Sequence, residues 1–271
     1  MTKIIHITPR KIATILCVII FCLFAVNMAI IYLHFVQGHE HLKGFVRGFY
    51  FDAEANFPSL YSALAIVLCS VLLWLIGSNH EEKLKKRALY WKFLSLVFAF
   101  LALDEFAGLH EDLAEPVKSL IDQSSIQSDY LHFAWFIPYS IATLVLGIIY
   151  LRFFFKLPLR TRKHLFLSAF LFLSGAVGME MVGGKYWASQ NWAPDLSQKV
   201  NFTYALIITM EELLEMLGIV IFAYALAEYL FKNREESILF RFSNPQKPDS
   251  EHQAHGWQRS EPSKTPQETD L

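Results

Sequence analysis

The stretch Ile12–Val36 (IATILCVIIFCLFAVNMAIIYLHFV) decides the class of fold, because it is long and apolar enough to cross a lipid bilayer as one helix. A helix needs about 20 mainly apolar residues to cross roughly 30 Å of hydrocarbon. Arg10 and Lys11 precede the stretch, as basic residues precede a signal peptide. The stretch is far longer than the apolar segment of a signal peptide, which has about 7–15 residues, and no A-x-A-like cleavage site follows it. We therefore predict a retained first membrane span.

Five further apolar blocks of similar length follow along the chain. They cover approximately Phe57–Gly77, Leu89–His110, His132–Phe155, His164–Trp187 and Thr203–Phe231. The whole chain of 271 residues is 54% hydrophobic, whereas a soluble domain is usually nearer to roughly 45–50% apolar. We therefore predict an all-α, polytopic integral membrane protein in which residues 1–243 form a bundle of six transmembrane helices. Residues 244–271 are rich in Pro, Ser, Gln and charge, and predict a disordered tail.

The distribution of Lys and Arg predicts the orientation of the bundle. The N-terminal segment, the second and fourth connections and the start of the tail together hold 15 of these residues, and the alternate connections hold 5. Connections rich in Lys and Arg stay in the cytoplasm. Both termini are therefore predicted to be cytoplasmic, with the chain in a plasma or inner membrane.

Ionisable side chains recur within the predicted spans or at their ends. They are Asp52 and Glu54 before the second span, Asp104, Glu105, His110 and Glu111 at the end of the third, His132 at the start of the fourth, Glu180 in the fifth, and Glu211, Glu212 and Glu215 in the sixth. A carboxylate at the centre of a span costs roughly 2.5–3.5 kcal/mol on insertion scales, and such residues usually mark function. A shared reason for this whole set is therefore expected.

The predicted topology brings these acids to a similar depth. With a rise of about 1.5 Å per residue, Asp104, Glu180 and Glu211 each lie roughly 10 Å below the outer surface, and Glu215 lies deeper. Residues seven apart share a helix face, so Asp104 and Glu111 point the same way and Glu105 points elsewhere. The sequence therefore predicts a polar site that opens outward between spans two, three, five and six.

A metal site is the first hypothesis for this cluster. Carboxylates with one or two imidazoles suit Zn²⁺, Mn²⁺, Mg²⁺ or Fe, and an open coordination position can activate water for hydrolysis. The candidate ligands are Asp104, His110, Glu111, His132, Glu180, Glu211 and Glu215. Glu212 is the candidate general base, and the depth of the site favours a lipid-like substrate. The sequence contains neither H-E-x-x-H nor a pair of E-x-x-H segments of the di-iron type.

Two other hypotheses remain open. The carboxylates can serve a proton- or cation-coupled transporter, although the apolar inner halves of the spans offer no polar path to the cytoplasm. They can also line a polar cavity in a structural membrane protein without catalysis. A net charge of −1 gives no basic surface for nucleic acid, and no motif indicates a nucleotide, flavin or haem. Beyond the lipid bilayer itself, the expected partner is a lipid-like or small cationic ligand.

Overall fold

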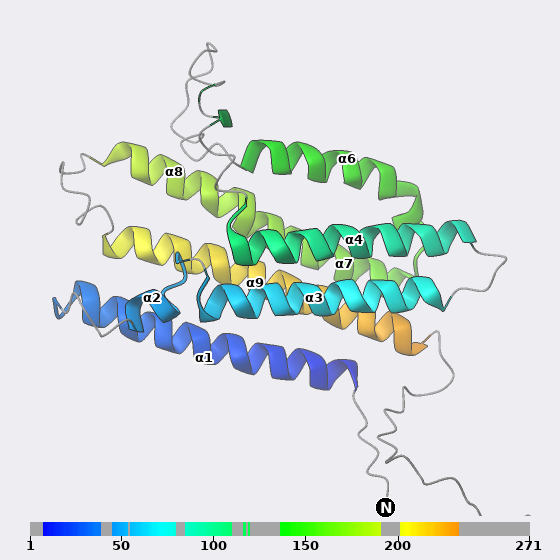
Figure 1. The fold of residues 1–271 in the computed structure, drawn as a ribbon, viewed down its shortest axis with the longest axis horizontal. Coiled ribbons are helices and arrows are strands. Elements are labelled where there is room, and N and C mark those ends of the chain that lie inside the picture. The colour runs from blue at the N-terminus through cyan, green and yellow to red at the C-terminus, as the bar shows by residue number, and fades with distance from the viewer. Residues whose placement is uncertain are drawn as a thin grey trace, which may run out of the picture. The chain divides into compact units, whose positions relative to one another are not determined.

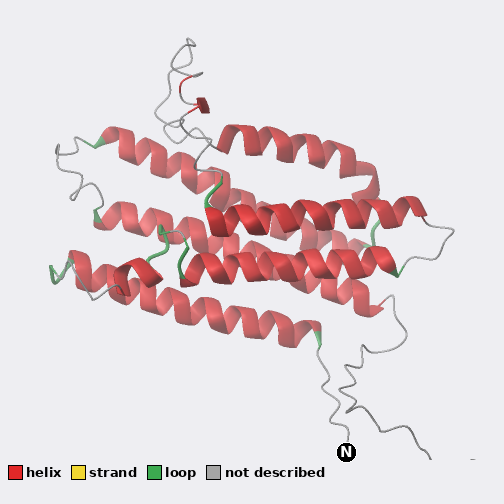
Figure 2. Ribbon diagram, viewed as in Figure 1, coloured by secondary structure: helices red, strands yellow, loops and turns green. Residues whose placement is uncertain are grey.

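The computed structural model describes residues 8–38, 45–53, 55–79, 85–109, 116–117, 119, 136–190 and 201–232. Within these residues the chain is helical and forms no strand, as Figures 1 and 2 show. The all-α prediction is therefore confirmed for this part of the chain. The predicted tail, residues 244–271, and three of the predicted ligands, His110, Glu111 and His132, lie outside the described residues.

The long helices follow the predicted spans, with ends that differ by a few residues. The elements are α1 (Pro9–Phe35), α2 (Phe45–Phe49), α3 (Phe57–Ser78), α4 (Lys85–Ala107), α6 (Phe136–Phe155), α7 (Leu159–Leu173), the π-helical segment η4 (Ser174–Met179), α8 (Glu180–Ser189) and α9 (Phe202–Lys232). Among the described residues, four helical stretches are long and apolar enough to cross a membrane, by length and composition: Pro9–Phe35, Phe57–Ser78, Phe136–Phe155 and Leu159–Ser189. The other two long helices, α4 and α9, carry charged residues among the apolar ones.

The start of α3 is fixed by a capping box. The side chain of Asn56 accepts a hydrogen bond from the backbone N–H of Ser59 at 3.0 Å, and the Ser59 hydroxyl accepts one from the backbone N–H of Asn56 at 3.0 Å. These bonds satisfy backbone donors that the first turn of a helix leaves without partners. The amide of Asn56 also donates to the carbonyl of Tyr50 at 2.7 Å. Hydrogen bonds of Asn56 therefore hold the turn before α3 against the start of that helix.

The fifth predicted span, His164–Trp187, is helical but not regular. Between α7 and α8 the backbone widens into the π-helical segment η4, and the N–H of Glu180 bonds to the carbonyl of Gly175, five residues earlier. A π-helical turn accommodates one residue more than an α-helical turn. The span therefore contains a wide turn that directly precedes Glu180.

Helix α9 lies at the centre of the bundle, in contact with α1, α3, α7, η4 and α8 (Figure 1). Its contact with α7 and η4 depends on two glycines. A Cβ at Gly175 would lie 2.7 Å from the carbonyl oxygen of Glu211, and a Cβ at Gly218 would lie 2.9 Å from the backbone nitrogen of Phe172. The hydroxyl of Ser168 donates to the carbonyl of Gly218 at 2.8 Å across the same contact. Small residues therefore let the two backbones approach closely, as is common between membrane helices.

Helices α3 and α4 form a second close pair. The hydroxyls of Ser70 and Ser95 each donate to the backbone carbonyl of the other residue at 2.8 Å. Near the end of α3, a Cβ at Gly77 would lie 3.2 Å from the Cβ of Trp91. Both serines are buried, so these reciprocal bonds satisfy polar groups that the apolar surroundings would otherwise leave without partners.

A buried polar contact that the sequence did not reveal joins α1 to α9. The side chain of Asn27 is completely buried. Its amide donates to the Thr209 hydroxyl at 2.9 Å, and its oxygen accepts the backbone N–H of Phe51 at 3.2 Å. Thr209 in turn donates to the carbonyl of Ala205 at 2.7 Å. Asn27 therefore holds both α9 and the segment before α3, which borders the cavity described below.

The glycine contact generates a prediction for stability. We expect Gly218→Ala to lower the free energy of unfolding by about 1–3 kcal/mol, because the added methyl group overpacks the contact with Phe172. Unfolding in mixed detergent micelles measures this change. Gly147→Ala on α6 is the matched control, since a Cβ there meets nothing within 4 Å, and it should leave stability unchanged or raise it by up to about 1 kcal/mol. Equal effects of the two substitutions would contradict the close contact.

Candidate functional site

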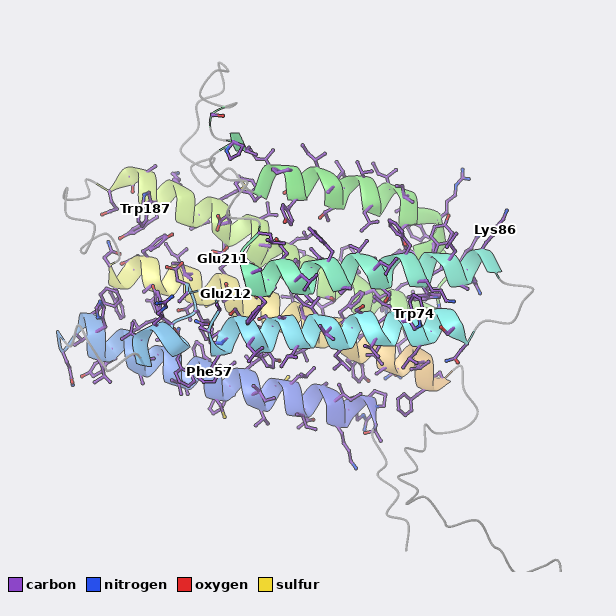
Figure 3. All side chains as sticks on the ribbon, in the orientation of Figure 1. Phe57, Trp74, Lys86, Trp187, Glu211 and Glu212 are labelled. Atoms are coloured by element: carbon purple, nitrogen blue, oxygen red, sulfur yellow. The ribbon has the colours of Figure 1, made fainter. Side chains whose placement is uncertain are left out.

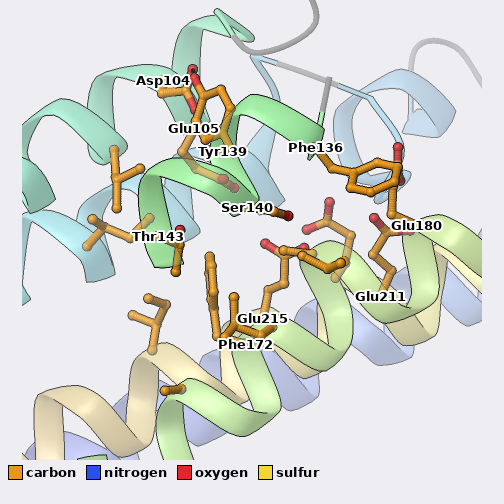
Figure 4. Close-up of a pocket in the computed structure, with 18 of the residues that line it drawn as sticks. Asp104, Glu105, Phe136, Tyr139, Ser140, Thr143, Phe172, Glu180, Glu211 and Glu215 are labelled. Atoms are coloured by element: carbon orange, nitrogen blue, oxygen red, sulfur yellow. Dashed lines mark hydrogen bonds between the residues drawn. The ribbon is translucent and has the colours of Figure 1, made fainter. Parts of the chain in front are cut away.

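One cavity of about 1040 Å³ lies within the bundle, bordered by α3, α4, α6, α7, η4, α8, α9 and the turn before α3 (Figure 4). Seven carboxylic acids line it: Asp52, Asp104, Glu105, Glu180, Glu211, Glu212 and Glu215. Its neutral polar lining residues are Ser59, Tyr139, Ser140, Thr143, Ser168 and Tyr204. Among the described residues that line the cavity there is no Lys, Arg or His. Its polar lining is therefore strongly acidic.

The acids of α8 and α9 form the centre of the site. Glu180 begins α8 immediately after the π-helical segment, and its carboxyl group interacts electrostatically with that of Glu211 on α9. Glu215, one turn further along α9, interacts electrostatically with Glu180, Glu212 and Glu105. The close approach of Gly175 to α9 brings these groups together.

Helix α4 contributes the opposite wall. Asp104 is only 6% exposed, and its Oδ1 accepts a hydrogen bond of 2.8 Å from the hydroxyl of Tyr139 on α6. Glu105, which is predicted to lie on a different face of the helix from Asp104, also lines the cavity. Adjacent residues on a helix point about 100° apart. The cavity beside α4 reaches both α6 and α9, so it is wide enough to be lined by the side chains of both Asp104 and Glu105.

The structure brings five of the predicted site residues to the one cavity: Asp104, Glu180, Glu211, Glu212 and Glu215. The remaining three, His110, Glu111 and His132, are outside the described residues. Within the described residues no group of three or more His, Cys, Asp or Glu is placed to hold a metal ion. Metal ligation by this set and the role of Glu212 as a base therefore stay predictions.

The prediction assigns only His132 of the fourth span to the site, and the structure shows that α6, the helix of this span, forms one of the cavity walls. Phe136, Tyr139, Ser140 and Thr143 of α6 all line the cavity (Figure 4). The hydroxyl oxygen of Ser140 is enclosed and has no hydrogen-bond partner among the described residues. Polar residues at positions 139, 140 and 143 of an otherwise apolar helix were the signal that could have located this wall.

Part of the cavity is apolar. Along α9 the acids give way to Ile219 and Phe222, and along α4 they give way to Phe98. The rings of Phe98 and Phe222 stack with centroids 4.6 Å apart and planes within 6°, and Phe172 of α7 lines the same region. The cavity therefore has an acidic part and an aromatic part.

The position of the acids along the bundle is visible in Figure 3. Lys86 marks one end of the bundle and Trp187 the other, and Glu211 and Glu212 lie toward the Trp187 end. We call these the Lys86 end and the Trp187 end. The apolar residues that follow on α9 extend the cavity toward the Lys86 end.

At the Lys86 end, a buried acid outside the cavity has basic neighbours. Glu228 near the end of α9 is 9% exposed and pairs with Arg160 at 2.9 Å, His164 at 3.6 Å and Lys232 at 3.9 Å. Nearby basic groups offset its charge, and the bridges to Arg160 and His164 join α7 to α9. No Lys, Arg or His is among the described residues that line the cavity, so the setting of its acids is distinct from that of Glu228.

Comparison with protein families gives one match. A family described as a domain of unknown function, DUF8692, matches residues 14–229. The chain belongs to this family. The matched region contains every described residue that lines the cavity. Comparisons with curated proteins and with solved structures gave no match.

The bond between α4 and α6 generates a prediction. In a double-mutant cycle of Tyr139→Phe and Asp104→Asn, we expect a coupling energy of about 0.5–3 kcal/mol, because each substitution weakens the same hydrogen bond. Unfolding in mixed micelles provides the four free energies. A second cycle pairs Tyr150→Phe with Asp104→Asn. It should be additive, since Tyr150 donates to the carbonyl of Tyr90 instead. Additivity in the first cycle would contradict the bond.

Proposed function

We propose that the chain is a six-span membrane protein of the plasma or inner membrane, with both termini in the cytoplasm. The lengths of α4 and α9, 23 and 31 residues, support spans three and six, because they correspond to roughly 35 Å and 46 Å of helix. Exposed basic residues at the Lys86 end, such as Lys86, Arg152 and Lys163, support a cytoplasmic position for that end. The cavity acids then lie in the outer half of the bilayer.

We propose further that the cavity binds a divalent metal ion and uses it to hydrolyse a lipid-like substrate. The observation that carries this proposal is the convergence of seven carboxylic acids, without a basic residue among the described lining, on one cavity with aromatic walls. A cation relieves the repulsion among carboxylates held in a low dielectric. Glu180, Glu211, Glu215 and Asp104 are the proposed oxygen ligands, and the imidazoles of His110 and His132, with the carboxylate of Glu111, would complete the set.

The proposed chemistry assigns distinct roles to neighbouring acids. A divalent ion lowers the pKa of a bound water and polarises the bond to be cleaved. Glu212, which lines the cavity beside the proposed ligands, would take the proton from that water as general base. The aromatic part of the cavity would hold the apolar part of the substrate.

Cation-coupled transport remains the alternative function. The acids of α8 and α9 favour it, because carboxyl groups gathered inside a membrane bundle are what proton and ion pathways use. The apolar end of the cavity opposes it, since the stacked rings of Phe98 and Phe222 line the way toward the Lys86 end. The proposed hydrolase needs no path through that end.

Metal analysis tests the first proposal. Purified protein should contain about one or two divalent ions per chain by elemental mass spectrometry, and Glu180→Gln and Glu211→Gln should each lower that content at least about tenfold. Glu228→Gln is the matched control, because it removes a carboxylate of the same helix that pairs with Arg160 outside the cavity. Absence of stoichiometric metal from the native protein would contradict the proposal, and proton flux in liposomes would then test transport.

Glu212→Gln separates a base from a ligand. We expect this variant to retain the native metal content and to lose about 10²–10⁴-fold in the rate of hydrolysis, the usual range for removal of a general base. Elemental analysis and turnover of a lipid ester or amide library measure the two quantities. Loss of the metal from this variant would assign Glu212 to the ligands instead.

A further inference from the structure

Helix α6 is a thin wall between the cavity and its surroundings. Of its residues only Phe136 and Phe153, close to its two ends, are buried, and its main contacts are with α4 and η4. Its outer face is strongly apolar and exposed, with Leu144 and Ile148 each 65% exposed. In a bilayer this face contacts lipid. Its other face contributes Ala142 to the cavity lining, so one helix separates the cavity from lipid.

The attachments of α6 are concentrated toward its two ends. At the Lys86 end Phe153 stacks on Tyr90, with centroids 5.1 Å apart, and meets Trp91 edge-on at 5.0 Å. Toward the Trp187 end the hydroxyl of Tyr139 donates a hydrogen bond of 2.8 Å to Asp104 of α4. Between these attachments α6 lines the cavity with the small or flexible residues Ala142, Thr143 and Leu146.

The cavity lining specifies the chemistry of an occupant. A bare cation would leave the aromatic region of Phe98, Phe172 and Phe222 unfilled. A wholly apolar molecule would remove the carboxylic acids from water without giving them a partner, which costs free energy. An anionic head group would be repelled by the acids. A volume of about 1040 Å³ is at the upper end of the roughly 300–1,000 Å³ of pockets that hold drug-sized ligands.

We propose that the cavity takes up, from the bilayer and past α6, a single-chain amphiphile with a cationic head group. Its ammonium group would lie against Glu180, Glu211 and Glu215, within reach of the enclosed hydroxyl of Ser140. Its chain would lie along the aromatic region. This inference shares its cavity with the proposed function but is an alternative to the metal there, because the ammonium group would occupy Glu180, Glu211 and Glu215, the carboxylates proposed as ligands of the ion.

Binding of matched probes tests the inference. The full-length protein in lipid nanodiscs, treated with a chelator, is titrated with dodecylamine, dodecanol and dodecanoate, which share a chain and differ in head-group charge. We expect dodecylamine to bind at least about tenfold more tightly than dodecanoate. The amount bound should depend on the mole fraction of dodecylamine in the lipid and not on its concentration in water. Equal affinities, or tighter binding of dodecanoate, would overturn the cationic head group. Affinity that follows the aqueous concentration would overturn entry from the bilayer.

Two neighbouring tryptophan substitutions on α6 provide the matched pair. Ala142→Trp places a large side chain in the cavity lining and should weaken dodecylamine binding at least about tenfold. Ile141→Trp changes an exposed residue that is not among the described lining residues and should leave affinity within about twofold. Equal effects of the two would overturn binding in the cavity. Binding of dodecylamine by a native protein that contains no metal would contradict the metal proposal and support this one.

Discussion

The close contact of Gly175 with the Glu211–Glu215 turn, repeated between Gly218 and Phe172, is the constraint on which the site depends. Helices in a bilayer are not driven together by the hydrophobic effect, because lipid chains are as apolar as leucine. Close backbone approach and the hydrogen bond from Ser168 to the carbonyl of Gly218 stabilise this pair instead. The same contact sets Glu180 beside Glu211. One contact between helices therefore both stabilises the bundle and brings the acids of the cavity together.

Helix α9 carries acids in two settings. Glu228 pairs with Arg160, His164 and Lys232. Glu211 has another acid, Glu180, as an electrostatic neighbour. Neighbouring acids in a low dielectric repel one another, and a proton or a bound cation relieves this repulsion. The first setting ties α7 to α9, and the second leaves room for a ligand.

The convergence of the acids could be predicted because topology and helical rise alone place Asp104, Glu180 and Glu211 at one depth. The topology follows from the positions of the apolar blocks and of Lys and Arg in the sequence, and the rise per residue is a constant of the α-helix. That Glu105 lines the cavity as well as Asp104 could not be predicted, since periodicity describes one helix and not the width of the space beside it. The buried Asn27 gave no signal, because a single polar residue in an apolar span does not indicate its partner on another helix. Of the fourth span only His132 was assigned to the site, although Tyr139, Ser140 and Thr143 marked the wall that α6 forms.

The π-helical segment before Glu180 has a consequence for how this region can vary. A π-helical turn is equivalent to one extra residue inserted into an α-helix, and the bond from Glu180 to Gly175 closes that turn. Loss of one residue from Ser174–Met179 would close this turn to α-helical pairing and leave α8 facing the same way, because the wide turn absorbs the extra residue. Loss of one residue from the regular helix α7 would instead rotate the residues that follow by about 100°, and Glu180 would turn away from Glu211. The π-helical segment is therefore the part of this span in which the chain can lose a residue without changing which side chains line the cavity.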